Sequence, residues 1–169
     1  MKKVLLILMV LVTVSFSVNS FAEIEIKYDK FKNRTFVQIE PTRSVMAGTS
    51  IKPALDLVGW YEGQKPYKPK TCIIGFSAIS PSWKYLSCHS VYCLADGKRV
   101  EMPPSKHHGE VLPNRVVFEI ITILVPFSIV EGISKCENIQ FKICDTEFSL
   151  SKYEMEDLKT FVGVFQKSN

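Results

Sequence analysis

The sequence has little of what usually marks a catalytic site. It contains no glycine-rich loop of the kind that cradles phosphates, and no serine in a Gly-x-Ser-x-Gly elbow. No low-complexity tract and no internal repeat interrupts it. These absences leave no local motif that would name a nucleotide-binding site or a serine hydrolase.

A strong charge of one sign is also missing. The chain carries 21 Lys and Arg against 17 Asp and Glu. Without Lys2 and Lys3, which precede the expected cleavage site described below, 19 basic residues face the 17 acidic ones, a net charge near +2. We therefore expect neither a nucleic-acid partner nor a strongly acidic one.

The apolar run at the N-terminus is too short to cross a bilayer. It follows Lys3 and extends over residues 4–14, about 11 residues where a membrane-spanning helix needs about 20. Small side chains at Ser20 and Ala22 then suit signal peptidase. We expect a signal peptide over residues 1–22, with an uncleaved membrane anchor as the alternative.

The remaining 147 residues (169 less 22) have the size of a single domain over residues 23–169. A chain of that length buries about 68–70% of its unfolded surface, so it can form a core without bound metal. The first cysteine is Cys72, too far along the chain to accept a lipid. We expect a periplasmic or secreted protein with no stable membrane insertion after cleavage.

Alternation of polar and apolar residues predicts a domain made mostly of strands. Residues 23–31 and 35–40 form a hairpin in this interpretation. Asp96-Gly97 is a strong hairpin turn and ends the extended run of residues 83–95. Further strands are expected over residues 55–61, 71–79, 98–102, 116–125 (covered on both faces), 138–143 and 146–150, with loops over residues 62–70 and 103–114.

Two helices are expected near the C-terminus. Pro126 suits the first turn of a short helix over residues 127–137, which Gly132 weakens. Ser151 and Glu154 form a capping box for the second helix. Its apolar face is formed by Met155, Leu158, Phe161, Val162 and Phe165. The predicted fold class is α+β, mainly an antiparallel sheet with the two late helices packed on one face. The alternative is a two-sheet β-sandwich with a C-terminal helix.

Five cysteines in an exported chain favour disulfide formation. If residues 71–79 pair antiparallel with residues 86–95, Cys72 lies opposite Cys93, within the distance of about 7 Å that a disulfide spans. We therefore predict a bridge between Cys72 and Cys93. The alternative is that the cysteines are small core residues.

A small hydrolase or thiol enzyme would use Cys88 or Glu119 with a histidine from residues 106–110. On an extended strand His89 points away from Cys88 and cannot activate it, so Cys88 is more simply a buried structural residue. Glu119 lies within an apolar run and is expected to reach an edge or to pair with a lysine.

A metal site is not expected. His89 and Cys93 share a face of the predicted strand but lie about 13 Å apart along it. His107 and His108 are adjacent in a predicted loop, where histidines are usually solvated. We expect neither a metal nor another cofactor.

Two features suit contact with a partner. Residues 65–70 combine three lysines with two prolines and a tyrosine, and could touch lipid headgroups or glycans, although a solvated loop is the simpler interpretation. Four aromatic residues could form a binding surface, or else belong to the core. They are Trp60, Tyr61, Trp83 and Tyr85.

The chain resembles a group of uncharacterised exported bacterial proteins and lipoproteins. The resemblance rests on four segments: YDKFK (28–32), WKYLSCH (83–89), LADG (94–97) and EFSLS (147–151). It implies export and a shared fold, and it carries no activity and no catalytic residue. The lipid-accepting cysteine of some such proteins is absent here.

The sequence therefore favours an exported, non-enzymatic domain that binds a protein, a glycan or the envelope surface. The hydrolase or thiol enzyme with Cys88 or Glu119 stays as the alternative.

Overall fold

The structure is a computed structural model that describes residues 24–39, 52–113 and 115–166. The predicted signal peptide, residues 1–22, lies outside this range. Within the described part of the chain, no helix is both long enough and apolar enough to span a bilayer.

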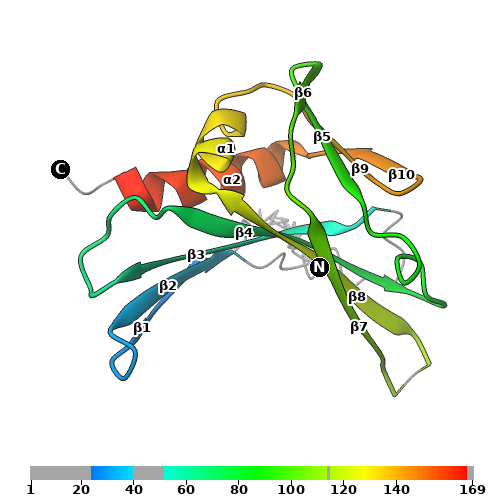
Figure 1. The fold of residues 1–169 in the computed structure, drawn as a ribbon, viewed down its shortest axis with the longest axis horizontal. Coiled ribbons are helices and arrows are strands. Elements are labelled where there is room, and N and C mark those ends of the chain that lie inside the picture. The colour runs from blue at the N-terminus through cyan, green and yellow to red at the C-terminus, as the bar shows by residue number, and fades with distance from the viewer. Residues whose placement is uncertain (1–23, 40–51, 114, 167–169) are drawn as a thin grey trace, which may run out of the picture.

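In the described residues, ten antiparallel strands form two sheets, and two helices accompany them (Figure 1). The six-stranded sheet has the order β1-β2-β3-β4-β8-β7, and the four-stranded sheet has the order β10-β9-β5-β6. The strands are β1 (Ile24–Asp29), β2 (Arg34–Ile39), β3 (Ala54–Glu62), β4 (Thr71–Ser80), β5 (Val91–Ala95), β6 (Lys98–Val100), β7 (Ser105–Val111), β8 (Val117–Pro126), β9 (Ile139–Ile143) and β10 (Thr146–Ser149). The helices are α1 (Phe127–Ile133) and α2 (Lys152–Gln166). The predicted α+β class with two helices is confirmed.

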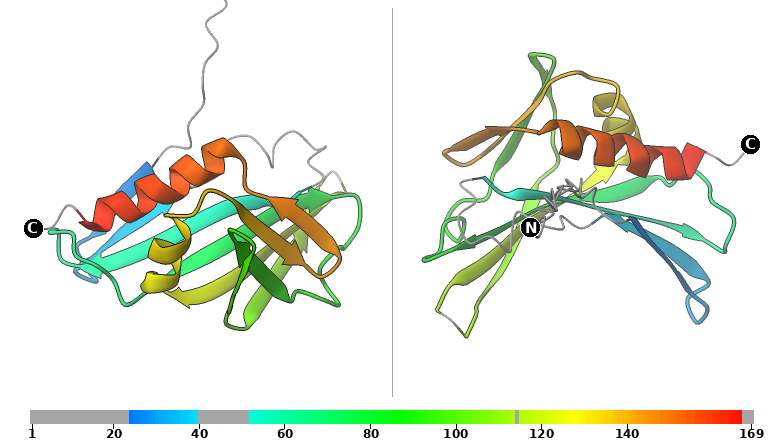
Figure 2. Two further views of the ribbon diagram at one scale, coloured as in Figure 1. Left: turned by 90° about the horizontal axis from the view of Figure 1, so that it is seen from above. Right: turned by 180° about the vertical axis from the view of Figure 1, so that it is seen from behind.

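The six-stranded sheet forms an arch, with the β1–β2 and β7–β8 hairpins as its two ends (Figures 1 and 2). Both helices and the four-stranded sheet lie on one side of it. Side chains on that side are buried in a common core, among them Leu57, Ile74 and Ile123. Alternation with period two places them on one face of their strands, as the sequence indicated.

The predicted N-terminal hairpin is confirmed. β1 and β2 pair from Ile24 opposite Ile39 to Asp29 opposite Arg34. Asn33 has φ of 46°, the left-handed conformation that a short polar side chain tolerates. The hairpin therefore follows from local sequence alone.

The loop predicted over residues 103–114 is wrong, because residues 105–111 form the edge strand β7, paired with β8. The mistake has a physical cause. An edge strand contacts the sheet on one side only, so it can carry Lys106, His108 and Glu110, which are all exposed. Its polar composition concealed its extended conformation.

The strand predicted over residues 83–95 is also wrong in its first part, because only Val91–Ala95 is extended and residues 81–90 form an irregular connection. The bridge predicted between Cys72 and Cys93 depended on that strand. Instead, β4 lies between β3 and β8, with Cys72 opposite Val125, and β5 belongs to the other sheet. Cys72 and Cys93 are both free and buried.

The C-terminal helix is held by its predicted capping box. The backbone N–H of Glu154 donates to Oγ of Ser151 at 3.3 Å, and the backbone N–H of Ser151 donates to Oε2 of Glu154 at 2.7 Å. The helix packs where β3 carries Gly59, because a Cβ there would lie 2.5 Å from Cζ of Phe165. Sequence and packing thus agree on the position of α2.

Candidate functional site

The connection of residues 81–90 contains four of the candidate residues, namely Trp83, Tyr85, Cys88 and His89. It passes beside the end of the arch formed by β7 and β8. Its Tyr85 side chain is 1% exposed, and the Tyr85 hydroxyl lies 3.4 Å from Oγ1 of Thr146 on β10. Burial raises the pKa of Tyr85. Tyr85 therefore joins the connection to the second sheet and belongs to the core.

Glu119 on β8 is fully buried and anchors the same connection. Its Oε2 accepts the backbone N–H of Lys84 at 2.8 Å, and its Oε1 accepts that of Tyr85 at 2.9 Å. Nε2 of His107 lies 3.0 Å from Oε1. The expected edge position or lysine partner for Glu119 is therefore wrong. Three groups of the protein occupy its oxygens, and no solvent reaches it.

The histidines do not surround an open site. The rings of His89 and His107 are stacked with centroids 5.9 Å apart, and Trp83 lies 6.1 Å from His107. His108 lies opposite Ile120 on the other face of the sheet. In the described ranges, no three His, Cys, Asp or Glu residues are grouped as metal ligands would be. Nδ1 of His89 is buried without a hydrogen-bond partner.

Cys88 is bonded to Cys144, with their Cα atoms 5.9 Å apart. This bridge was not predicted. Cys88 is exposed rather than buried, so its structural role comes from the covalent bond. In this bonded state it has no thiolate with which to attack a substrate. Burial also raises the pKa of Cys72 and of Cys93 to about 12, which keeps both as thiols at neutral pH.

A groove of about 400 Å³ lies on the outer face of the four-stranded sheet. On β5 the side chains of Val91, Cys93 and Ala95 point into the core, so Tyr92 and Leu94 point outward. These two residues are 49% and 39% exposed. They form the apolar centre of the groove, which has the size of a ligand site.

Polar residues surround this centre on the neighbouring strands. The pairing places Lys142 of β9 opposite Tyr92, and Gln140 of β9 and Arg99 of β6 opposite Leu94. Lys142 forms an ion pair of 2.6 Å with Glu147. The hydrogen bond between them raises the pKa of Lys142 and lowers that of Glu147.

Arg99 differs from Lys142, because no described acidic residue forms an ion pair with it. A guanidinium group with five N–H donors thus lies beside the exposed Leu94 side chain. The groove offers an apolar contact next to an unneutralised cation. Such an arrangement suits a ligand that carries an apolar group close to a carboxylate.

The residues predicted as binding candidates lie elsewhere. Tyr61 is buried, and Tyr67 packs on it with ring centroids 6.0 Å apart. Lys68, from the basic segment 65–70, forms an ion pair of 2.5 Å with Glu131 of α1. The groove residues were missed because a single outward Tyr and Leu on a short strand give no distinctive pattern in sequence.

No model of a known protein family matches the chain, and no curated protein and no solved structure is significantly similar to it.

Proposed function

We propose that the chain is an exported, non-enzymatic domain that binds a segment of a partner protein in the groove on its four-stranded sheet. The observation that carries the proposal is the groove itself, in which Tyr92 and Leu94 remain exposed beside Arg99. The expected ligand presents an apolar side chain to Tyr92 and Leu94 and a carboxylate to Arg99. The Cys88–Cys144 bridge supports export, because disulfides persist in oxidising compartments.

The enzyme alternative receives less support. Cys88 is bonded to Cys144. Glu119 lies within hydrogen-bond distance of His107, as a catalytic pair would, but the carboxyl group is fully buried and already accepts two backbone N–H groups. A general acid or base must reach the substrate directly or through one water molecule. The contacts of Glu119 favour an anchoring role instead.

Site-specific photo-crosslinking tests the proposal. A photoreactive residue at position 94 should capture one discrete protein from envelope extracts. The matched control is the same residue at position 156, an exposed site on α2. With the captured partner purified, Leu94→Asp and Arg99→Glu should each weaken binding by about tenfold, the effect of losing a central interface residue. Equal capture at both positions, or binding unaffected by both substitutions, would refute the groove as the site.

A further inference from the structure

The turn of the β1–β2 hairpin exposes Phe31 almost completely, at 89%. Hydrogen bonds within the turn fix its backbone conformation. Oδ1 of Asp29 accepts the backbone N–H groups of Phe31 at 2.9 Å and of Lys32 at 3.2 Å. The Tyr28 hydroxyl donates to Oδ1 of Asn33 at 3.0 Å and closes the turn. The fold therefore holds the Phe31 ring outward, where it packs against no part of the core.

Cations accompany this ring. Lys30 and Lys32 flank Phe31 in sequence, and Nζ of Lys30 lies 5.2 Å from the ring centroid. Across the hairpin the cations are Lys27, Lys30, Lys32 and Arg34, and the acids are Glu25 and Asp29. Asp29 already accepts two hydrogen bonds within the turn. The tip therefore presents an exposed aromatic ring, and the charged residues around the ring carry a net positive charge.

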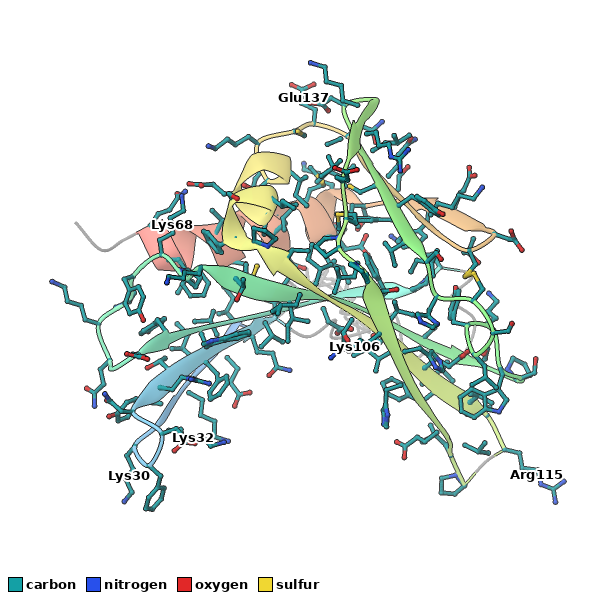
Figure 3. All side chains as sticks on the ribbon, viewed as in Figure 1. Lys30, Lys32, Lys68, Lys106, Arg115 and Glu137 are labelled. Atoms are coloured by element: carbon teal, nitrogen blue, oxygen red, sulfur yellow. A yellow bond between two sulfur atoms is a disulfide. The ribbon has the colours of Figure 1, made fainter. Side chains whose placement is uncertain are left out.

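A second tip, at the other end of the arch, also carries an exposed apolar side chain and a cation, beside the exposed Glu110. In the β7–β8 hairpin Val111 is 60% exposed, and Arg115 is exposed with φ of 64°. Figures 1 and 2 show both hairpins pointing to the side of the arch opposite the helices. In Figure 3, Lys30 and Lys32 mark one tip and Arg115 the other. A flat surface that touches one tip can therefore touch both.

We propose that these two hairpin tips dock the protein on the surface of an anionic lipid bilayer. Phe31 enters the boundary between headgroups and acyl chains, helped by Val111, while Lys30, Lys32 and Arg115 contact lipid phosphates. A flat anionic surface is favoured over a protein partner because the tips are separate, project to the same level and join apolar groups to cations. The four-stranded sheet, which carries the groove, lies on the other side of the arch (Figure 1), so docking of the tips leaves the groove uncovered.

Vesicle co-sedimentation tests this docking. The exported, processed protein is mixed with vesicles rich in phosphatidylglycerol, and in parallel with vesicles of phosphatidylcholine alone. We expect binding to the first and little to the second. Phe31→Ser should weaken binding by about tenfold, the cost of leaving one large apolar side chain in water. Reversal of the two lysine charges beside Phe31, by Lys30→Glu together with Lys32→Glu, should weaken vesicle binding by about a hundredfold.

Lys152→Glu with Lys159→Glu is the matched charge control, because both lysines are exposed on α2, on the side of the arch away from the tips. It should bind almost as the natural protein does, and thermal melting of every variant confirms that it is folded. Brominated lipid should quench the tryptophan fluorescence of a Phe31→Trp variant more strongly than that of the natural protein, which has only its two native tryptophans. Absence of binding to anionic vesicles, or equal binding by Phe31→Ser, overturns the proposal. The proposal is also overturned if the binding of a soluble protein requires Phe31 while the binding of vesicles does not.

Discussion

The connection of residues 81–90 and the β1–β2 turn both carry aromatic residues outside regular structure, yet the protein treats them in opposite ways. In the connection, Tyr85 enters the core, Glu119 holds two consecutive backbone N–H groups, and Cys88 is bonded to Cys144. In the turn, hydrogen bonds to Asp29 and from Tyr28 fix a backbone conformation in which Phe31 lies outside the core.

The difference shows where to look for function in this chain. Two residues of the connection that attract attention in the sequence, Tyr85 and Cys88, stabilise the fold through core burial and through the disulfide. The side chains that we propose contact partners are instead exposed, namely Phe31 in the turn at 89% and Tyr92 and Leu94 in the groove at 49% and 39%.

The largest expected effect separates two tyrosines. Tyr85→Ala should lower the free energy of unfolding by about 3–5 kcal/mol, as truncation of a buried aromatic side chain does. Tyr92→Ala, at an exposed strand position, should change it by about 0.5 kcal/mol or less. Urea denaturation measures both. If the two substitutions cost the same, the connection is not anchored by Tyr85.

Removal of the disulfide should come next in size. Replacing Cys88 and Cys144 by serine should destabilise the protein by about 2–4 kcal/mol, because the bond restricts the unfolded chain across a separation of 56 residues. Replacing Cys72 and Cys93 by serine leaves the Cys88–Cys144 disulfide in place. Peptide mapping of the unreduced protein should find Cys88 linked to Cys144. A Cys72–Cys93 peptide would contradict this account.

A smaller effect depends on pH and concerns the β5–β6 turn. Oδ1 of Asp96 accepts the backbone N–H groups of Asn138 at 2.8 Å and Glu137 at 3.0 Å. These bonds, that to Asn138 first, hold the pKa of Asp96 below its usual range. Because the folded pKa is the lower one, the stabilisation is complete above the unfolded value of about 3.9 and is lost as the pH falls through the folded value.

Asp96→Asn should therefore be less stable than the natural protein at neutral pH, and the difference should shrink in acid. Asparagine tolerates the positive φ of 47° at this position, so the turn itself is kept. Thermal melts of both proteins between neutral pH and about pH 2–3 measure the convergence. A difference that is constant over this range would mean that the Asp96 charge contributes nothing.

The smallest expected effect on stability is at the exposed tip. Phe31→Ser should change the free energy of unfolding by about 0.5 kcal/mol or less, since the ring packs against no part of the core. The same substitution should weaken vesicle binding, as proposed above. A loss of stability comparable to that of Tyr85→Ala would show that Phe31 serves the fold after all.

The sequence predicted the elements whose causes are local. The N-terminal hairpin, the Asp96-Gly97 turn and the Ser151–Glu154 cap each depend on residues within a few positions of one another.

The errors arose where distant segments decide the outcome. The connection of residues 81–90 contains alternating apolar residues, but Glu119 and Cys144, both more than 30 positions away, hold it out of a strand. The Cys88–Cys144 bridge requires that β5 pair with β9, which no local pattern indicates. The groove could not be predicted either, because it depends on which faces the two sheets leave uncovered.

If Glu119 stabilises the fold and the groove binds the partner, one pair of affinities separates the two roles most directly. The protein captured at position 94 is titrated against Glu119→Gln and Leu94→Asp, at a temperature where circular dichroism shows both to be folded. We predict that Glu119→Gln binds with unchanged affinity and that Leu94→Asp binds about tenfold more weakly. Loss of binding in Glu119→Gln with full binding in Leu94→Asp would contradict the account.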